Sequence, residues 1–159
     1  YIRTDYVVKR RNEVKNINAR RDQMHVPLQR SASQKIDSLD EMVLDVEVGF
    51  TDTLLKLIDE SGQTDAKVYK KANIDRKLFS KIRNNRYYRP SKNTILAFAI
   101  ALELTLNQTN DLLSRAGYIL SKSIMFDVII IECLIKNIHN IHYINNILFV
   151  YDQELLGSQ

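Results

Sequence analysis

The chain has 159 residues and a formal net charge of +4, with 45% hydrophobic and 26% charged residues, proportions that are ordinary for a soluble globular protein. Its four glycines and two prolines are too few for the many turns of an all-β fold. The single cysteine, Cys133, excludes an internal disulfide and suits a reducing compartment. The composition therefore predicts an all-α protein of the cytoplasm.

Charge alternates along the chain in four blocks. Residues 1–35 contain nine Lys and Arg against three Asp and Glu, and residues 36–63 contain one Lys against eight acidic residues. Residues 64–92 contain ten Lys and Arg against two Asp, and residues 93–159 contain three against six. This alternation predicts a localised polyanion-binding face and not a uniformly basic protein.

Residues 1–35 are predicted to be a basic arm or linker, or the remnant of an upstream domain. Their apolar residues are sparse and poorly phased, and the first residues lack the apolar core of a signal peptide. Because the chain starts at Tyr1 and not at methionine, we expect further protein before it. Residues 36–120 are then predicted to form an acidic lead-in helix, beginning at Ser38, and a five-helix domain.

The five helices of that domain are expected between residues 50 and 117. The first carries an apolar stripe at Phe50, Leu54, Leu57 and Ile58, and the fourth is the apolar run TILAFAIALEL. Residues suited to helix ends separate the helices: Gly62 after the first, Thr64 before the second, Asp75 before and Asn84–Asn85 after the third, Ser91 before the fourth, and Asn107 before and Ala116–Gly117 after the fifth. At Asn84–Asn85 we expect a left-handed backbone, which asparagine tolerates.

Residues 121–159 are predicted to be a C-terminal extension of two or more helices packed on this domain. Its two helical patterns are KSIMFDVIIIECLIKN and YINNILFVYDQELL. Apolar residues surround the segment 124–135 almost completely, so we expect it to be buried. This segment is too short to span a bilayer and contains two acids, so no membrane partner is expected. The apolar residues of the second pattern favour a homodimer formed through residues 122–157.

Residues 64–90, TDAKVYKKANIDRKLFSKIRNNRYYRP, have the periodicity and charge of a helix-turn-helix. They resemble the five-helix DNA-binding domain of the Cro/cI type, the phage-repressor class, over residues 50–117. The residues that carry the resemblance are Ala66 and Val68 in the second helix, Asn73 and Ile74 in the turn, Phe79 and Ile82 in the recognition helix, and the following RPSKNTILAFAIALEL. The resemblance implies an all-α, five-helix repressor-like fold, here extended by two or more helices, and a bacterial or phage DNA-binding protein.

The resemblance also assigns candidate DNA contacts residue by residue. Arg76, Lys77 and Lys81 would face the major groove, with Ser80 beside them. The surrounding polar residues would contact the phosphate backbone, and they are Lys70, Lys71, Arg83, Arg86, Tyr87, Arg89 and Lys92. Two positions depart from the family pattern: Tyr69 stands where a small residue is usual, and the loop after the recognition helix has no glycine.

The span from about 50 to 157 also resembles a C-terminal helical module of larger bacterial proteins, one that sometimes follows a macro (ADP-ribose-binding) domain. The residues that carry this likeness include NIDRKLFSKIR, AFAIALEL, DLLSRAGY, Phe126–Asp127 and the closing Asp152–Gln153–Glu154–Leu155–Leu156–Gly157. It implies no particular activity, but it implies an upstream domain or a protein partner.

Signals for catalysis or for a cofactor are weak in this sequence. His139 and His142 have the spacing of two metal ligands on one helix face, but no cysteine or carboxylate cluster accompanies them. Cys133 has the helical spacing of a packed thiol. We therefore predict a protein that is not an enzyme and has no cofactor and no metal.

Two functions remain open at the level of the sequence. The first is a transcriptional regulator that reads double-stranded DNA with the helix at 75–83. The second is a repressor-like helical module reused for protein interaction or assembly, sensing a partner for an upstream effector domain. Tyr87 and Tyr88 also have two interpretations, either as contacts at the edge of the groove or as packing on the next helix.

Overall fold

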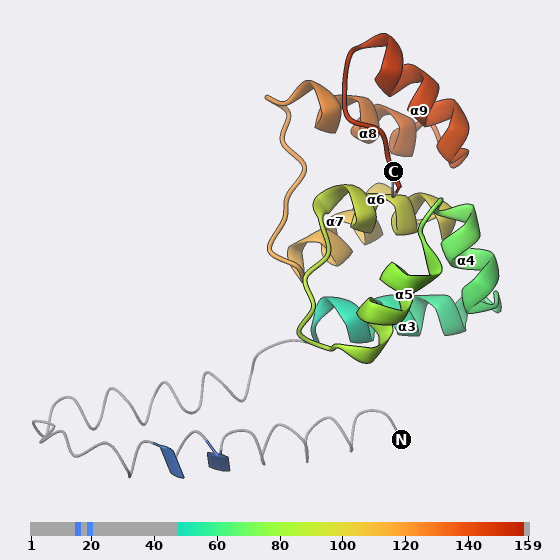
Figure 1. The fold of residues 1–159 in the computed structure, drawn as a ribbon. Helices are drawn as coiled ribbons and strands as arrows, with labels where there is room; N and C mark the ends of the chain where they lie inside the picture. Colours follow the sequence, from blue (N-terminus) through green and yellow to red (C-terminus); the bar gives the residue numbers. More distant parts are fainter. Residues whose placement is uncertain (1–14, 17–18, 21–47, 158–159) are drawn as a thin grey trace, which may run out of the picture. The chain divides into compact units, whose positions relative to one another are not determined.

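Seven α-helices follow one another in the computed structural model, which describes residues 15–16, 19–20 and 48–157 (Figure 1). They are α3 (Phe50–Glu60), α4 (Asp65–Lys71), α5 (Arg76–Asn84), α6 (Lys92–Ala101), α7 (Leu106–Ser114), α8 (Met125–Ile135) and α9 (Ile141–Val150). Residues 48–157 belong to one compact unit and contain no strand. The predicted all-α fold, with five repressor-like helices and two further helices, is confirmed for this part of the chain. The lead-in helix predicted from Ser38 lies outside the described residues.

Helix α6 is the centre of the unit. Its residues from Thr94 to Ala101 are all buried, because apolar side chains occupy every side of the helix. It packs against α4, α7 and α9, as Figure 1 shows. The predicted apolar helix TILAFAIALEL is thus the common support of the helix-turn-helix and of the C-terminal extension.

Several helices end in a left-handed residue that is not glycine. Asn73, Glu103, Asn137 and Asp152 have φ angles of 53°, 57°, 54° and 55°. At each of these ends two backbone N–H groups donate to carbonyls of the last turn, as in a Schellman motif; Asn73 donates to Lys70 and Ile74 to Tyr69, at 3.0 and 2.8 Å. The short chain reversals therefore need few glycines, which explains how an all-α fold forms with so few of them.

Two predicted helix ends are wrong in detail. Asn85 follows α5 with a φ of −121°, so the predicted left-handed residue is not there; the Asn85 side chain instead accepts a hydrogen bond from the Tyr87 backbone at 3.0 Å. The cap of α7 is Thr105 and not Asn107. Thr105 forms a capping box with Gln108, which satisfies two backbone donors and starts the helix before Asn107.

The extension packs on the five-helix part through one face of each helix. Helix α8 contacts α7, and α9 contacts α6 and α8. The prediction that segment 124–135 is buried is only half right: Ile129, Ile130, Cys133 and Leu134 are buried, but Ile124, Met125 and Ile135 are exposed. Residues on the outer side of α8 have no helix over them among the described residues. No helix in the described part of the chain is long and apolar enough to cross a membrane.

Candidate nucleic-acid interface

Helices α4 and α5 are joined by a short turn whose ends are capped on both sides. The Thr64 side chain accepts a hydrogen bond from the Lys67 backbone and starts α4. Asn73 closes α4 in the left-handed conformation, and Ile74 is buried beneath the turn. The Asp75 side chain then accepts from the Lys77 backbone and starts α5. The predicted cap Thr64 is confirmed, and so are the start of the recognition helix at Asp75 and the turn at Asn73.

Three aromatic rings anchor α5 to the core. Phe79 and Ile82 point inward from α5 and are buried. The Phe79 ring lies 5.5 Å from the Tyr69 ring of α4 and 6.0 Å from the Phe98 ring of α6, measured between centroids. Tyr69 is half-buried in this row, so the bulky residue at the helix crossing packs against the recognition helix. Ala66, which was expected in the core, is exposed instead.

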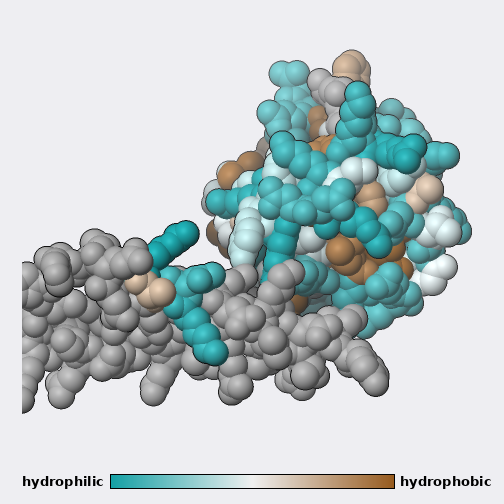
Figure 2. Space-filling view, turned by 60° about the horizontal axis from the view of Figure 1, so that its bottom comes forward, coloured by the Kyte–Doolittle hydropathy of each residue, from teal (hydrophilic) through white to brown (hydrophobic). Residues whose placement is uncertain are grey.

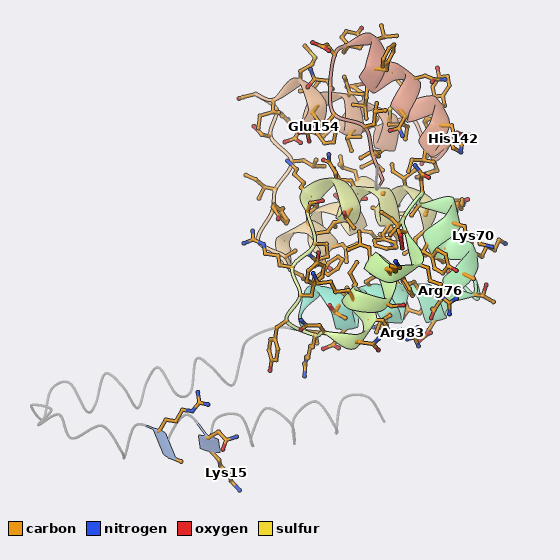
Figure 3. The ribbon with its side chains drawn as sticks, viewed as in Figure 1. Lys15, Lys70, Arg76, Arg83, His142 and Glu154 are labelled. Atoms are coloured by element: carbon orange, nitrogen blue, oxygen red, sulfur yellow. The ribbon has the colours of Figure 1, made fainter. Side chains whose placement is uncertain are left out.

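The residues predicted to read bases lie on the outer side and at the start of α5. Arg76, Lys77 and Lys81 are exposed, and Ser80 is half-buried (Figure 3 labels Arg76). Within the described part of the chain, Arg76 and Lys77 have no acidic partner. The Lys81 ammonium lies 4.5 Å above the Tyr88 ring, which gives it a cation–π contact. The two cations nearest the start of α5 are therefore available to an external anion.

Most residues predicted to contact the DNA backbone are engaged within the protein. Lys70, labelled in Figure 3, is exposed and has no acidic partner among the described residues. The other cations each have a partner: Lys71 with Glu103 (2.6 Å), Arg83 with Asp65, Arg86 with Asp52 (2.8 Å), Arg89 with the Gly117 carbonyl (3.2 Å), and Lys92 with Asp127 (2.6 Å). Their roles as DNA contacts remain predictions.

These internal pairs hold the recognition helix in place. Arg83 ties α5 to α4 through Asp65, and Arg86, just after α5, is tied to α3 through Asp52. The hydrogen bond from Lys71 lowers the pKa of Glu103 below its ordinary value. An exposed pair such as Lys71–Glu103 adds little stability, because water screens its charges. The pairs also neutralise charge away from the start of α5.

The unneutralised positive charge gathers on α4 and at the first turn of α5. Lys67 is exposed and forms no salt bridge among the described residues, although its charge contributes to lowering the pKa of Glu103. It belongs to the basic block of the sequence but was not among the predicted DNA contacts. Its signal was the spacing to Lys70, three residues on, which places both on one helix face. The face of this unit drawn in Figure 2 is mostly hydrophilic, with a few hydrophobic patches.

The two tyrosines after α5 have different environments. Tyr87 is 76% exposed, whereas Tyr88 is half-buried and packs against the core beneath Lys81. The packing interpretation therefore holds for Tyr88, and the interpretation as a contact at the groove edge is left for Tyr87.

The other residues considered for chemistry do not form a site in the described part of the chain. His139 lies before α9, with Nε2 3.2 Å from the Leu104 carbonyl, while His142 is exposed on α9. Cys133 is buried, and burial raises the pKa of its thiol. No group of three or more metal-binding side chains occurs among the described residues. A shallow cavity of about 340 Å³ lies beside Lys92, Asp127 and Glu154, away from the start of α5.

Comparison with known families agrees with this geometry. Residues 53–114, which run from α3 to the end of α7, match the family model of the Cro/C1-type HTH DNA-binding domain. No curated protein and no solved structure matches the chain. The match includes most of α3 and all of α4 to α7, and it stops before α8.

Proposed function

We propose that this chain, whose residues 53–114 are a Cro/C1-type helix-turn-helix DNA-binding domain, is a transcriptional regulator that reads duplex DNA with α5. The observation that carries the proposal is the pair Arg76 and Lys77 at the first turn of a recognition helix held by its aromatic row. In helix-turn-helix proteins the N-terminal residues of the recognition helix contact base edges in the major groove. Arginine and lysine there suit the acceptor atoms of guanine.

The roles of the basic residues follow from their surroundings. Arg76 and Lys77 are proposed to read bases, with Lys81 and Ser80 one turn further along α5. Lys67 and Lys70, on α4, are proposed to contact phosphates. Arg83 and Arg86 are proposed to position α5 through their ion pairs, and an ion-paired arginine still offers N–H groups to a phosphate.

The direct test is to select duplexes from a pool of genomic fragments with the purified protein. We expect the retained fragments to share a short common sequence, because base contacts discriminate between sequences by about 1–3 kcal/mol each. Failure to retain any duplex at low salt would contradict the proposal.

Single substitutions are expected to separate base reading from phosphate contact. Arg76→Ala should relax the preference at one position of the selected sequence, because a side chain that contacts a base edge affects only that base pair. Lys70→Ala should weaken binding to all duplexes alike and reduce the steepness of the salt dependence by about one unit. Titrations of both variants against the selected duplex and a scrambled one, at two salt concentrations, measure both effects. Equal behaviour of the two variants would contradict the assigned roles.

We also propose that the chain forms a homodimer through residues 122–157. Of the apolar residues that suggested this, Ile141, Ile144 and Leu148 are buried inside the unit and cannot contribute. Of the predicted residues Tyr143 and Tyr151 remain exposed, and with Val150, which was not among them and is 77% exposed, they make a stripe on the outer side of α9; Ile147 is half-buried against the core. Two copies of a helix-turn-helix domain would then read two half-sites about one helical turn of DNA apart.

The dimer is expected to depend on that stripe. In sedimentation velocity at micromolar concentration the wild-type chain should sediment as a dimer, and Tyr143→Glu/Val150→Glu should sediment as a monomer, because charges would have to be buried. Ile119→Glu, at an apolar position that is 74% exposed and lies outside residues 122–157, serves as the control. A monomeric wild-type chain would contradict the dimer.

The exposed apolar stripe also supports the second candidate function. If the selected pool shows no duplex binding, the same surface would serve a protein partner, and the repressor-like helices would be an interaction module for an upstream effector domain. Apolar patches of this kind mark interaction sites but do not by themselves identify the partner.

A further inference from the structure

The chain turns back after α9 and runs toward the helix-turn-helix. Asp152, with φ 55°, reverses the chain, and the Asp152 and Gln153 backbone N–H groups donate to the Phe149 and Leu148 carbonyls. Figure 1 shows this last segment descending from α9 to end beside α6. The closing residues singled out in the sequence therefore form a returning strap, defined here as residues 153–157, and not the end of a helix.

Three contacts fix the strap. Leu156 is buried, with 2% of its surface exposed. The Asn145 side chain satisfies both backbone groups of Leu156: it accepts from the N–H at 2.8 Å and donates to the carbonyl at 3.1 Å. Glu154, labelled in Figure 3, accepts from Asn93 of α6 at 3.0 Å. The strap is thus held between α9 and α6 at a defined position.

The last residue of the strap packs directly against the turn between α4 and α5. A Cβ added to Gly157 would lie 2.7 Å from the Asn73 carbonyl oxygen and 3.1 Å from its Cβ and Nδ2. The φ of Gly157 is +95°, a conformation that other residues rarely adopt. Two independent requirements therefore select glycine, and one of them is the close approach to Asn73.

We propose that residues 153–157 position the recognition helix by bracing the Asn73 turn. Asn73 and Ile74 are bonded back to α4, and Asp75 and Arg76 follow at once and start α5. A shift of Asn73 is therefore transmitted over three residues to the side chains proposed to read bases. The extension acts on DNA recognition through this contact.

The test compares two glycine-to-alanine substitutions. Gly157→Ala adds a methyl group that meets Asn73, whereas Gly62→Ala is a matched control: Gly62 also has a positive φ, +66°, but a Cβ there would meet nothing within 4 Å. Each variant is titrated with the duplex selected by the wild-type chain, and its amide resonances and melting temperature are recorded.

This inference rests on the proposed function, and we expect Gly157→Ala to weaken DNA binding about tenfold, the equivalent of one lost base contact. Amide resonances of residues 73–77 should shift in Gly157→Ala and stay in place in Gly62→Ala. Wild-type affinity and unshifted resonances in Gly157→Ala would show that residues 153–157 do not position the recognition helix.

A second variant covers the case in which Gly157→Ala does not fold. A chain that ends at Leu156 keeps the buried Leu156 side chain and loses the contact of Gly157 with the turn, so it should fold, bind more weakly and show the same shifts. Full affinity with unshifted resonances in that shortened chain would also show that the contact of Gly157 with the turn does not position the recognition helix. If wild type binds no duplex, the proposed function fails, while the resonance shifts still decide whether the strap positions α5.

Discussion

Replacing Arg76, Lys77 and Lys81 together with alanine is expected to abolish sequence-specific DNA binding while leaving the fold intact. All three side chains are exposed, so their removal opens no cavity in the core. Each base contact is worth about 1–3 kcal/mol, or about 5- to 150-fold in affinity, and the losses of several contacts multiply. A titration of the triple variant against the selected duplex should therefore show only residual, sequence-independent binding.

A control with the same loss of charge separates position from charge. Lys56, Lys122 and Lys136 are also exposed but lie on α3, before α8 and at the end of α8. Their triple alanine variant removes three positive charges without touching α4 or α5. It should bind the selected duplex nearly as wild type does, with only a small general weakening. Equal affinities of the two triple variants would mean that α5 does not read DNA.

The second large effect is expected from Phe79→Ala. Phe79 is buried between the rings of Tyr69 and Phe98, so its truncation should leave a cavity and lower the free energy of unfolding by about 3–5 kcal/mol. Chemical denaturation followed by circular dichroism measures this change. Phe149→Ala, at a position 75% exposed, should change the free energy of unfolding by only about 0.5 kcal/mol.

Comparable stabilities for the two phenylalanine variants would show that the aromatic row is not the anchor of α5. If the row does anchor α5, Phe79→Leu should retain more stability than Phe79→Ala, because leucine fills part of the cavity.

The parts of the fold that depend on local chemistry could be predicted from the sequence. Thr64, Asp75 and Ser91 cap helices because their side-chain oxygens reach backbone N–H groups two or three residues on. The apolar run of α6 specified a buried helix without reference to any other segment. Asn73 could be placed in the turn because asparagine, after glycine, is the residue most tolerant of the left-handed conformation.

Other features depend on contacts between distant residues, which the sequence does not reveal. Glu103 ends α6 in the left-handed conformation although glutamate is not a typical residue for it. The pairs Arg86–Asp52 and Lys92–Asp127 join residues 34 and 35 positions apart, and Asp127 is almost fully buried beside Lys92. The basic block at residues 64–92 can be seen in the sequence. Which of its cations form ion pairs depends on acidic residues that only the fold brings close to them.

The measurement that tests the central proposal most directly is site-specific photo-crosslinking to duplex DNA from the start of α5. Lys77→Cys would carry the crosslinker, and Lys136→Cys, on the extension, would be the control. The native Cys133 is buried and its thiol pKa is raised, so the introduced cysteine should react selectively. We predict crosslinks to the selected duplex from position 77 and none from position 136. Crosslinks from position 136 alone, or from neither position at low salt, would contradict the proposal that α5 reads DNA.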